Sequence, residues 1–338
     1  MSAPRVETLG ADSQAAEIFE RVRREVGLYG AGTSEPAPAG ASCLVAWRGD
    51  HPRARVALLT RSDLHGAPGP TGMLGCYEAL DAEAGVAVLA AGRRALAERG
   101  VARVLGPMHG STWARYRLAL RPAAATATED PPPFLAEPWN PARYPDDFAA
   151  AGFEAVAHYE SRIDEYLDDA GDAPSLAARV NAAGVRVRAL DLERFDAELD
   201  ALFALSLEAF ADNLYYTPIE RAPFRAQYEK TRPLVDPQLV LIAEDSGGRP
   251  VAFQFAFRDP WSPADAPRVV VKTVATAPGA RGLGLGGHML DLIRQRARAV
   301  GCRGVIHALM HVDNFSMRMS ARHRTRVFRR YALYQWTP

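Results

Sequence analysis

A glycine-rich segment in the second half of the chain, residues 274–287, constrains the fold more than any other part of the sequence. It reads VATAPGARGLGLGG and stands between a run of β-branched residues and a stretch with helical periodicity. Glycine permits tight turns and lets backbone N–H groups approach a ligand without interference from Cβ. We therefore expect a strand, a loop and a helix N-terminus that bind phosphate oxygens, with Arg281 adding positive charge.

Two familiar nucleotide motifs do not fit this segment. A dinucleotide fold requires G-x-G-x-x-G with an acidic residue about twenty positions later, and a P-loop requires Gly-Lys followed by Ser or Thr. Here Gly282, Gly284 and Gly286 are spaced two apart, and no lysine follows them. The segment therefore predicts a phosphate site of another class.

The rest of the chain alternates predicted strands and helices, and it does so twice. The 338 residues exceed one average domain, and an acidic stretch with Gly171 and Pro174 marks a boundary. In the first half we expect strands near residues 5–10, 43–47, 55–60, 73–80 and 101–105, and helices near 13–25 and 84–99. In the second half we expect strands near residues 185–190, 239–244, 251–257, 269–276, 305–309 and 327–336, and helices near 195–210, 223–230, 287–300 and 315–323. Similar helix-strand units ending in Met-His, at 94–109 and 296–311, predict an internal duplication.

Composition excludes several classes of partner. Forty basic and forty acidic side chains leave no net field for nucleic acid or anionic lipid. The sequence shows neither a signal peptide nor an apolar run of spanning length, so we expect a cytoplasmic protein without a membrane partner. Cys43, Cys76 and Cys302 are scattered and offer no metal-ligand spacing, so we expect no disulfide and no metal. The oligomeric state stays open.

The glycine segment resembles motif A of the Gcn5-related N-acetyltransferase (GNAT) superfamily, R/Q-x-x-G-x-G/A, through Arg281, Gly284 and Gly286. The resemblance covers roughly residues 183–338. It implies an N-acetyltransferase that uses acetyl-CoA, or another acyl-CoA, as cosubstrate and a small amine as acceptor. The residues that it assigns to coenzyme A are a strand end, the loop and a later asparagine: Val274, Ala275, Thr276, Arg281, Gly282, Leu283, Gly284, Leu285, Gly286, Gly287 and Asn314.

The first half is similar to the degenerate first domain of bacterial tandem acetyltransferases. Where the loop would stand it has Asp81 and Glu83, whose carboxylates would repel a pyrophosphate. We therefore expect one coenzyme A per chain. The predicted fold class is α/β (α+β), with two tandem acetyltransferase-like domains, each a mixed, mostly antiparallel sheet flanked by helices. The predicted domains are 1–165, without the loop, and 183–338, catalytic, with residues 166–182 as linker.

The glutamate and tyrosine that many GNAT enzymes use as base and acid are missing here. Leu309, Ala321 and Arg268 occupy their usual positions. The remaining candidates for proton transfer are His311, His307 and Lys272 as bases and Tyr331 as acid. Tyr215 and Tyr216 follow a helix that lines the substrate in related folds, and they are the candidate acceptor contacts.

Three alternatives remain open. An aminoacyl-tRNA-dependent transferase would explain a duplication, although the neutral charge disfavours it. A non-catalytic acyl-CoA-binding or regulatory protein would explain the missing glutamate and tyrosine. A CoA-thioester decarboxylase or hydrolase on the same fold would need no amine.

Overall fold

A computed structural model describes residues 3–10, 13–26, 36–122, 130–169 and 173–338 of the chain. Residues 123–129 and part of the predicted linker, residues 170–172, lie outside this set. The described strands form one sheet: β1 (Arg5–Thr8), β2 (Ser42–Arg48), β3 (His51–Arg61), β4 (Thr71–Ala79), β5 (Arg103–Gly106), β6 (Leu118–Leu120), β7 (Glu154–Asp164), β8 (Arg186–Ala189), β9 (Val240–Glu244), β10 (Pro250–Arg258), β11 (Arg268–Thr276), β12 (Gly304–His311) and β13 (Thr325–Trp336).

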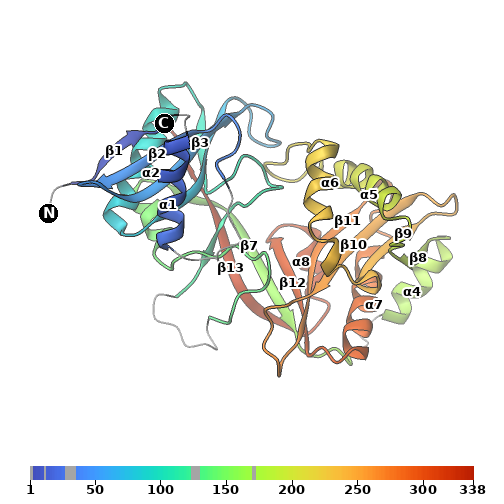
Figure 1. The fold of residues 1–338 in the computed structure, drawn as a ribbon. Coiled ribbons are helices and arrows are strands. Elements are labelled where there is room, and N and C mark those ends of the chain that lie inside the picture. The colour runs from blue at the N-terminus through green and yellow to red at the C-terminus, as the bar shows by residue number, and fades with distance from the viewer. Residues whose placement is uncertain (1–2, 11–12, 27–35, 123–129, 170–172) are drawn as a thin grey trace.

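Helices pack on both faces of this sheet (Figure 1). The α-helices are α1 (Ser13–Val26), α2 (Ala82–Ala97), α3 (Tyr144–Ala150), α4 (Ala173–Ala182), α5 (Phe195–Phe210), α6 (Arg221–Glu229), α7 (Leu285–Ala299) and α8 (Phe315–Ser320). Three short 3₁₀ turns are η1 (Arg232–Leu234), η2 (Pro237–Leu239) and η3 (Pro278–Ala280). None of the described helices is long and apolar enough to span a bilayer.

The strand order reads alike from both edges of the sheet: β1-β2-β3-β4-β5-β13-β7-β12-β11-β10-β9-β8. From either edge, four antiparallel strands are followed by one parallel partner, β5 beside β4 and β12 beside β11. This palindrome is the pattern expected of two copies of one supersecondary unit. It agrees with the duplication predicted from the sequence.

At the centre of the sheet the two halves exchange strands. β13, the last strand of the chain, pairs with β5 of the first half, while β7 of the first half pairs with β12 of the second. β13 and β7 also pair with each other over most of their length. In Figure 1 these two strands run between the lobes, and the C-terminus lies in the lobe that contains the N-terminus.

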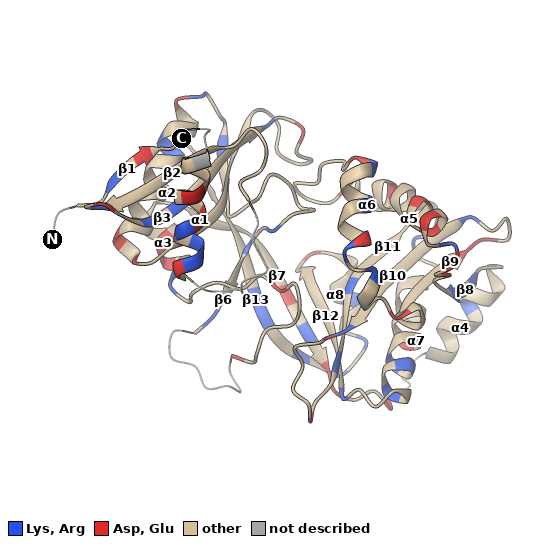
Figure 2. Ribbon diagram, viewed as in Figure 1, with Lys and Arg blue, Asp and Glu red and all other residues tan. Residues whose placement is uncertain are grey.

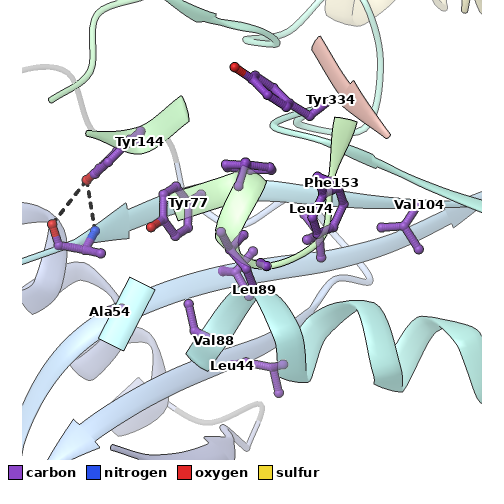
Figure 3. Close-up of a cluster of buried hydrophobic side chains, with 14 of the residues drawn as sticks. Leu44, Ala54, Leu74, Tyr77, Val88, Leu89, Val104, Tyr144, Phe153 and Tyr334 are labelled. Atoms are coloured by element: carbon purple, nitrogen blue, oxygen red, sulfur yellow. Dashed lines mark hydrogen bonds between the residues drawn. The ribbon is translucent and has the colours of Figure 1, made fainter. Parts of the chain in front are cut away.

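Alternating side chains place one apolar layer on each face of the sheet. In the second half, Val269 and Val271 pack towards α7, and beyond the register shift opposite Phe255 and Ala256, Ala275 packs towards α5. In the first half the equivalent layer contains Leu44, Leu74 and Leu89 (Figure 3). Basic and acidic residues are spread over both lobes (Figure 2), as the balanced composition predicts.

Most predicted elements are present within a few residues of their expected bounds. The predicted helix at 195–210 coincides with α5, and the predicted strand at 269–276 lies within β11. Two of the features that were not predicted matter most for the fold. α4 lies inside the stretch expected to be a linker, and it packs on α7. The exchange of β7 and β13 between the two halves left no signal in the sequence. The domain boundaries stay a prediction.

A buried ion pair holds β7 in the second half. The Nε of Arg294, on α7, donates to Oδ2 of Asp164, at the end of β7, at 2.6 Å. Both side chains are almost fully buried. Removing one partner from such a pair leaves the other charge buried without compensation, which costs roughly 3–5 kcal/mol.

We therefore expect Arg294→Met to lower the free energy of unfolding by about 3–5 kcal/mol. Denaturant titration measures this change. The matched control is Arg326→Gln, because Arg326 pairs with Glu165 in solvent, where such pairs contribute only about 0–1 kcal/mol. Equal losses in the two variants would show that the buried pair has no special role in stability.

Candidate active site

A cavity of about 660 Å³ lies between the two halves of the chain. The first half contributes the segments 112–117 and 136–138 and Tyr159 of β7. The second half contributes the end of α5 and the loop after it, part of α6, the adjoining parts of β11 and β12, and the start of α8. Both halves are therefore needed to form this cavity.

The cavity opens where β11 and β12 separate. Their parallel pairing ends at Val271 and His307. Beyond that point β11 continues against β10, and β12 continues against β7. A bulge in β12 carries Leu309 at φ +58°, and its N–H donates to Ser161 Oγ at 3.0 Å. Lys272 and Val274 therefore line the cavity from one strand, and Leu309 lines it from the other.

Lys272 is a strongly perturbed basic group in this lining. Burial, reinforced by the nearby Arg117 guanidinium and opposed by Glu137, lowers the pKa of Lys272 from 10.5 to about 7. No hydrogen bond or ion pair of its ammonium occurs among the described residues. A cavity lysine that is half neutral near pH 7 can accept a proton from a bound group.

The two candidate histidines both line the cavity, in different environments. His307 is buried, its Nδ1 lies 2.8 Å from Ser320 Oγ, and burial lowers its pKa to about 3, so it is a poor base near neutrality. His311 is partly buried, and burial also lowers its pKa below the usual 6.5. Its Nδ1 accepts the N–H of Asp313 at 3.2 Å, so the lone pair of the neutral ring is already engaged.

The candidate tyrosines separate into one cavity residue and two core residues. Tyr216 lines the cavity, and its hydroxyl has no hydrogen-bond partner among the described residues. Tyr215 instead packs in the core, with its N–H bonded to His65 O at 2.8 Å. Tyr331 donates its hydroxyl to Glu137, and burial raises its pKa well above 10. The structure thus does not bring Tyr215 or Tyr331 into the cavity, because the exchanged strand packs Tyr331 beneath Glu137.

The glycine loop lies outside this cavity and forms the N-terminus of α7. Gly282 and Gly284 adopt φ near +87° and +85°, which glycine alone adopts without strain. Gly284 is the N-cap and supplies no side-chain cap, so the first backbone N–H groups of α7 carry no capping carboxylate. Arg281 is half exposed beside the loop, and its guanidinium donates to Ala209 O at 3.2 Å.

The remaining residues that the sequence assigned to coenzyme A flank the loop or the cavity. Val274 and Asn314 line the cavity, and Asn314 is also the N-cap of α8. Ala275 and Thr276 pair with β10. Gly286 and Gly287 are buried in the first turn of α7, as is Leu285. Next to them lies Arg322, whose Nη1 would be only 1.9 Å from a Cβ on Gly287.

The corresponding helix of the first half, α2, has a closed N-terminus. Its N-cap, Asp81, accepts the N–H of Ala84 at 2.9 Å and pairs with Arg53 at 3.0 Å. This carboxylate occupies the position that an anionic ligand would take. Because Asp81 caps α2 and Gly284 leaves α7 without a side-chain cap, only α7 of these two helices has an N-terminus open to an anion.

The cavity residues that sequence reasoning missed include Arg117 and Tyr228. Arg117 is one of 38 arginines, and nothing in its sequence context distinguishes it. Tyr228 belongs to the helix predicted near residues 223–230, but helical periodicity does not show which residue of a helix faces a cavity formed with another element. Trp113 of the first half also lines the cavity and donates its Nε1–H to Thr217 O at 2.9 Å.

Comparison with known proteins identifies relatives of this architecture. A sequence model described as "Acetyltransferase (GNAT) family" matches residues 200–322. A protein named "Bacterial ceramide synthase" from Caulobacter vibrioides is 32% identical over 84 residues, which span 24% of this chain and 22% of that protein. The chain thus matches less than a quarter of that relative's length.

Three solved structures share the fold over 99% of this chain. A GCN5-related N-acetyltransferase from Sphaerobacter thermophilus aligns over 97% of its own length with a TM-score of 0.52 and 14% identity. A tandem GNAT protein of the clavulanic acid biosynthesis pathway aligns over 98% with a TM-score of 0.52 and 13% identity. A GCN5-related glucosamine N-acetyltransferase region of a fungal multi-domain β-N-acetylglucosaminidase aligns over 38% of that chain, with a TM-score of 0.57 and 14% identity. At these identities the likeness shows the fold.

The lowered pKa of Lys272 can be tested directly, because the chain has only two lysines, Lys230 and Lys272. We expect the NMR signal of one methylated lysine to titrate with a midpoint near pH 7. Lys272→Met should remove that signal, and Lys230→Met should leave it in place. A midpoint above 9 would mean that the cavity does not desolvate this ammonium.

Proposed function

We propose that this chain, whose residues 200–322 match the GNAT acetyltransferase family, transfers an acyl group from an acyl-CoA to a small amine. The observation that carries the proposal is the N-terminus of α7, which is lined by glycines and has no side-chain cap. This helix follows β11, the strand whose separation from β12 opens the cavity. In this arrangement the pyrophosphate binds at residues 281–287. The thioester reaches the opening between Val274 and Leu309, and the amine approaches from the cavity. Positioning two reactants in this way supplies a large share of the rate.

We assign the proton-accepting role to Lys272. A small aliphatic amine is protonated near neutral pH and must lose a proton before it attacks. The neutral Lys272 amine accepts this proton and releases it to solvent, and the freed nitrogen then forms the C–N bond to the thioester carbonyl. As the C–S bond breaks to release the thiolate, the attacking nitrogen loses its second proton to Lys272. The resulting Lys272 ammonium can return the proton to the thiolate. His307 is too weak a base, and the lone pair of His311 is engaged by Asp313.

The donor and the acceptor are proposed at the level of chemical class. We favour acetyl-CoA as donor and a small amine in the cytoplasm as acceptor, with no nucleic acid or membrane as partner. The relative named as a ceramide synthase supports a second pairing, because a ceramide is the fatty amide of a long-chain amino alcohol. Thiol release with acetyl-CoA and with a long-chain acyl-CoA, each against small amines and long-chain amino alcohols, distinguishes the two pairings.

We expect turnover to rise with pH through about 7, because the neutral form of Lys272 is required and its pKa is about 7. Lys272→Met should lower kcat by about a hundredfold and abolish this rise, with little change in acyl-CoA affinity. His311→Gln serves as the comparison and should retain both turnover and the pH profile. The reverse result, with His311 essential and Lys272 dispensable, would move the base to the histidine.

We expect Arg281→Gln to weaken acyl-CoA binding by about tenfold or more, since a hydrogen bond to a charged group contributes about 1.5–3 kcal/mol. Calorimetry should give one equivalent per chain, because Asp81 closes α2. Arg94→Gln, an exposed arginine of α2, is the control. Arg281 is preferable to Gly284 as a test, because any Cβ at Gly284 would lie 2.8 Å from Leu176 and disturb the fold. Two equivalents, or unchanged affinity, would contradict this assignment.

A further inference from the structure

Arg117 is a buried arginine in the lining of the cavity, supplied by the first half of the chain. Only 9% of its surface is exposed. Its backbone adopts φ +73°, a conformation that costs a non-glycine residue energy, and its N–H donates to Pro107 O at 3.0 Å. The first half therefore holds this residue in a defined, strained position.

Two aromatic rings fix the guanidinium of Arg117. Its Cζ lies 3.9 Å from the ring centroid of Tyr116 and 4.1 Å from that of Tyr159 on β7. Its Nη1 donates to the carbonyl of Leu309, in the bulge of β12, at 3.1 Å. The guanidinium is thus held against the strand end that faces Lys272.

This guanidinium has unused donors. Its Nε is buried without a hydrogen-bond partner among the described residues, and the bond from Nη1 to Leu309 is its sole hydrogen bond there. Nη2 also makes no hydrogen bond among the described residues and, unlike Nε, is not fully buried, so it is the donor that a carboxylate in the cavity can reach.

No carboxylate of the described residues neutralises Arg117 or its neighbour Lys272. Glu137, the acid whose charge raises the pKa of Lys272, already accepts from Arg329 Nε at 2.7 Å, from the Tyr331 hydroxyl and from Phe134 N–H at 3.1 Å. Arg117 and Lys272 appear in no ion pair of the described chain. Two adjacent, desolvated basic groups without an anion are costly, and a bound anion would offset that cost.

We propose that the acceptor is a small molecule with both an amine and a carboxylate, as in an amino acid, and that Arg117 binds its carboxylate. This inference rests on the proposed function and adds a substrate class to it. Arg117 and the α7 loop would then bind two different anions, because residues 281–287 do not line the cavity. With its carboxylate on Arg117, the amine lies towards Lys272 and the opening between β11 and β12.

The test compares amino acids with their carboxamides, which keep the amine and the side chain and lose the negative charge. We expect the wild type to prefer the carboxylates by at least tenfold in kcat/KM, the effect of a charged hydrogen bond of about 1.5–3 kcal/mol. Arg117→Gln should abolish this preference, chiefly by raising KM for the carboxylates, and Arg117→Lys should restore part of it. Arg303→Gln removes an exposed arginine beside β12 and should leave the preference intact.

The outcomes separate the two proposals. If amines are acylated but the wild-type protein shows the same kcat/KM for amino acids and for their carboxamides, the carboxylate inference is overturned and the acyltransferase function stands. This comparison does not depend on whether Arg117→Gln folds. If no amine is acylated, the proposed function fails, and calorimetry with the same amino acids and carboxamides decides the inference. Binding of the amino acids that depends on Arg117 supports it, and equal or absent binding overturns it.

Discussion

The reciprocal exchange of β7 and β13 is the constraint on which the rest of the structure depends. Because each half contributes its last strand to the other, the sheet is continuous through the centre of the molecule. The exchange places Tyr159 of the first half beside His311 of the second, with ring centroids 5.0 Å apart. It also brings Arg329 and Tyr331 beneath Glu137. The cavity walls are therefore set by backbone pairing between segments more than 140 residues apart.

The separation of β11 from β12 creates the opening in the sheet. β12 follows the exchanged β7 and bulges at Leu309, while β11 remains paired with β10. Backbone groups and side chains that would otherwise be covered, such as Lys272, then face a cavity. The low pKa of this lysine has the same origin, because the lobe that closes over it excludes water and brings Arg117 close.

The two halves share an order of strands, but they differ at the helix N-terminus that would bind an anionic ligand. α2 begins at Asp81, whose side chain caps its own helix, and α7 begins at Gly284, which has none. A single carboxylate at the N-cap accepts hydrogen bonds from the first N–H groups of its own helix, and these groups then no longer bind an anion. The first half instead contributes Trp113 and Arg117 to the cavity, which is consistent with a role in acceptor binding.

Local sequence determined the elements and the loop of this protein. The periodicity of residues 195–210 and 269–276 predicted α5 and β11, and the glycines at 282 and 284 do adopt the left-handed conformation that only glycine takes without strain. Lys272 could be singled out because it is one of two lysines, and two other candidates, His307 and His311, also line the cavity. Only the tertiary structure decided that Tyr331 is buried beneath Glu137 and that Arg117 lies close enough to Lys272 to lower its pKa. These facts depend on contacts between distant segments. The hydrophobic period and the residue spacing of a segment indicate its own conformation, but they do not indicate the partner against which it packs.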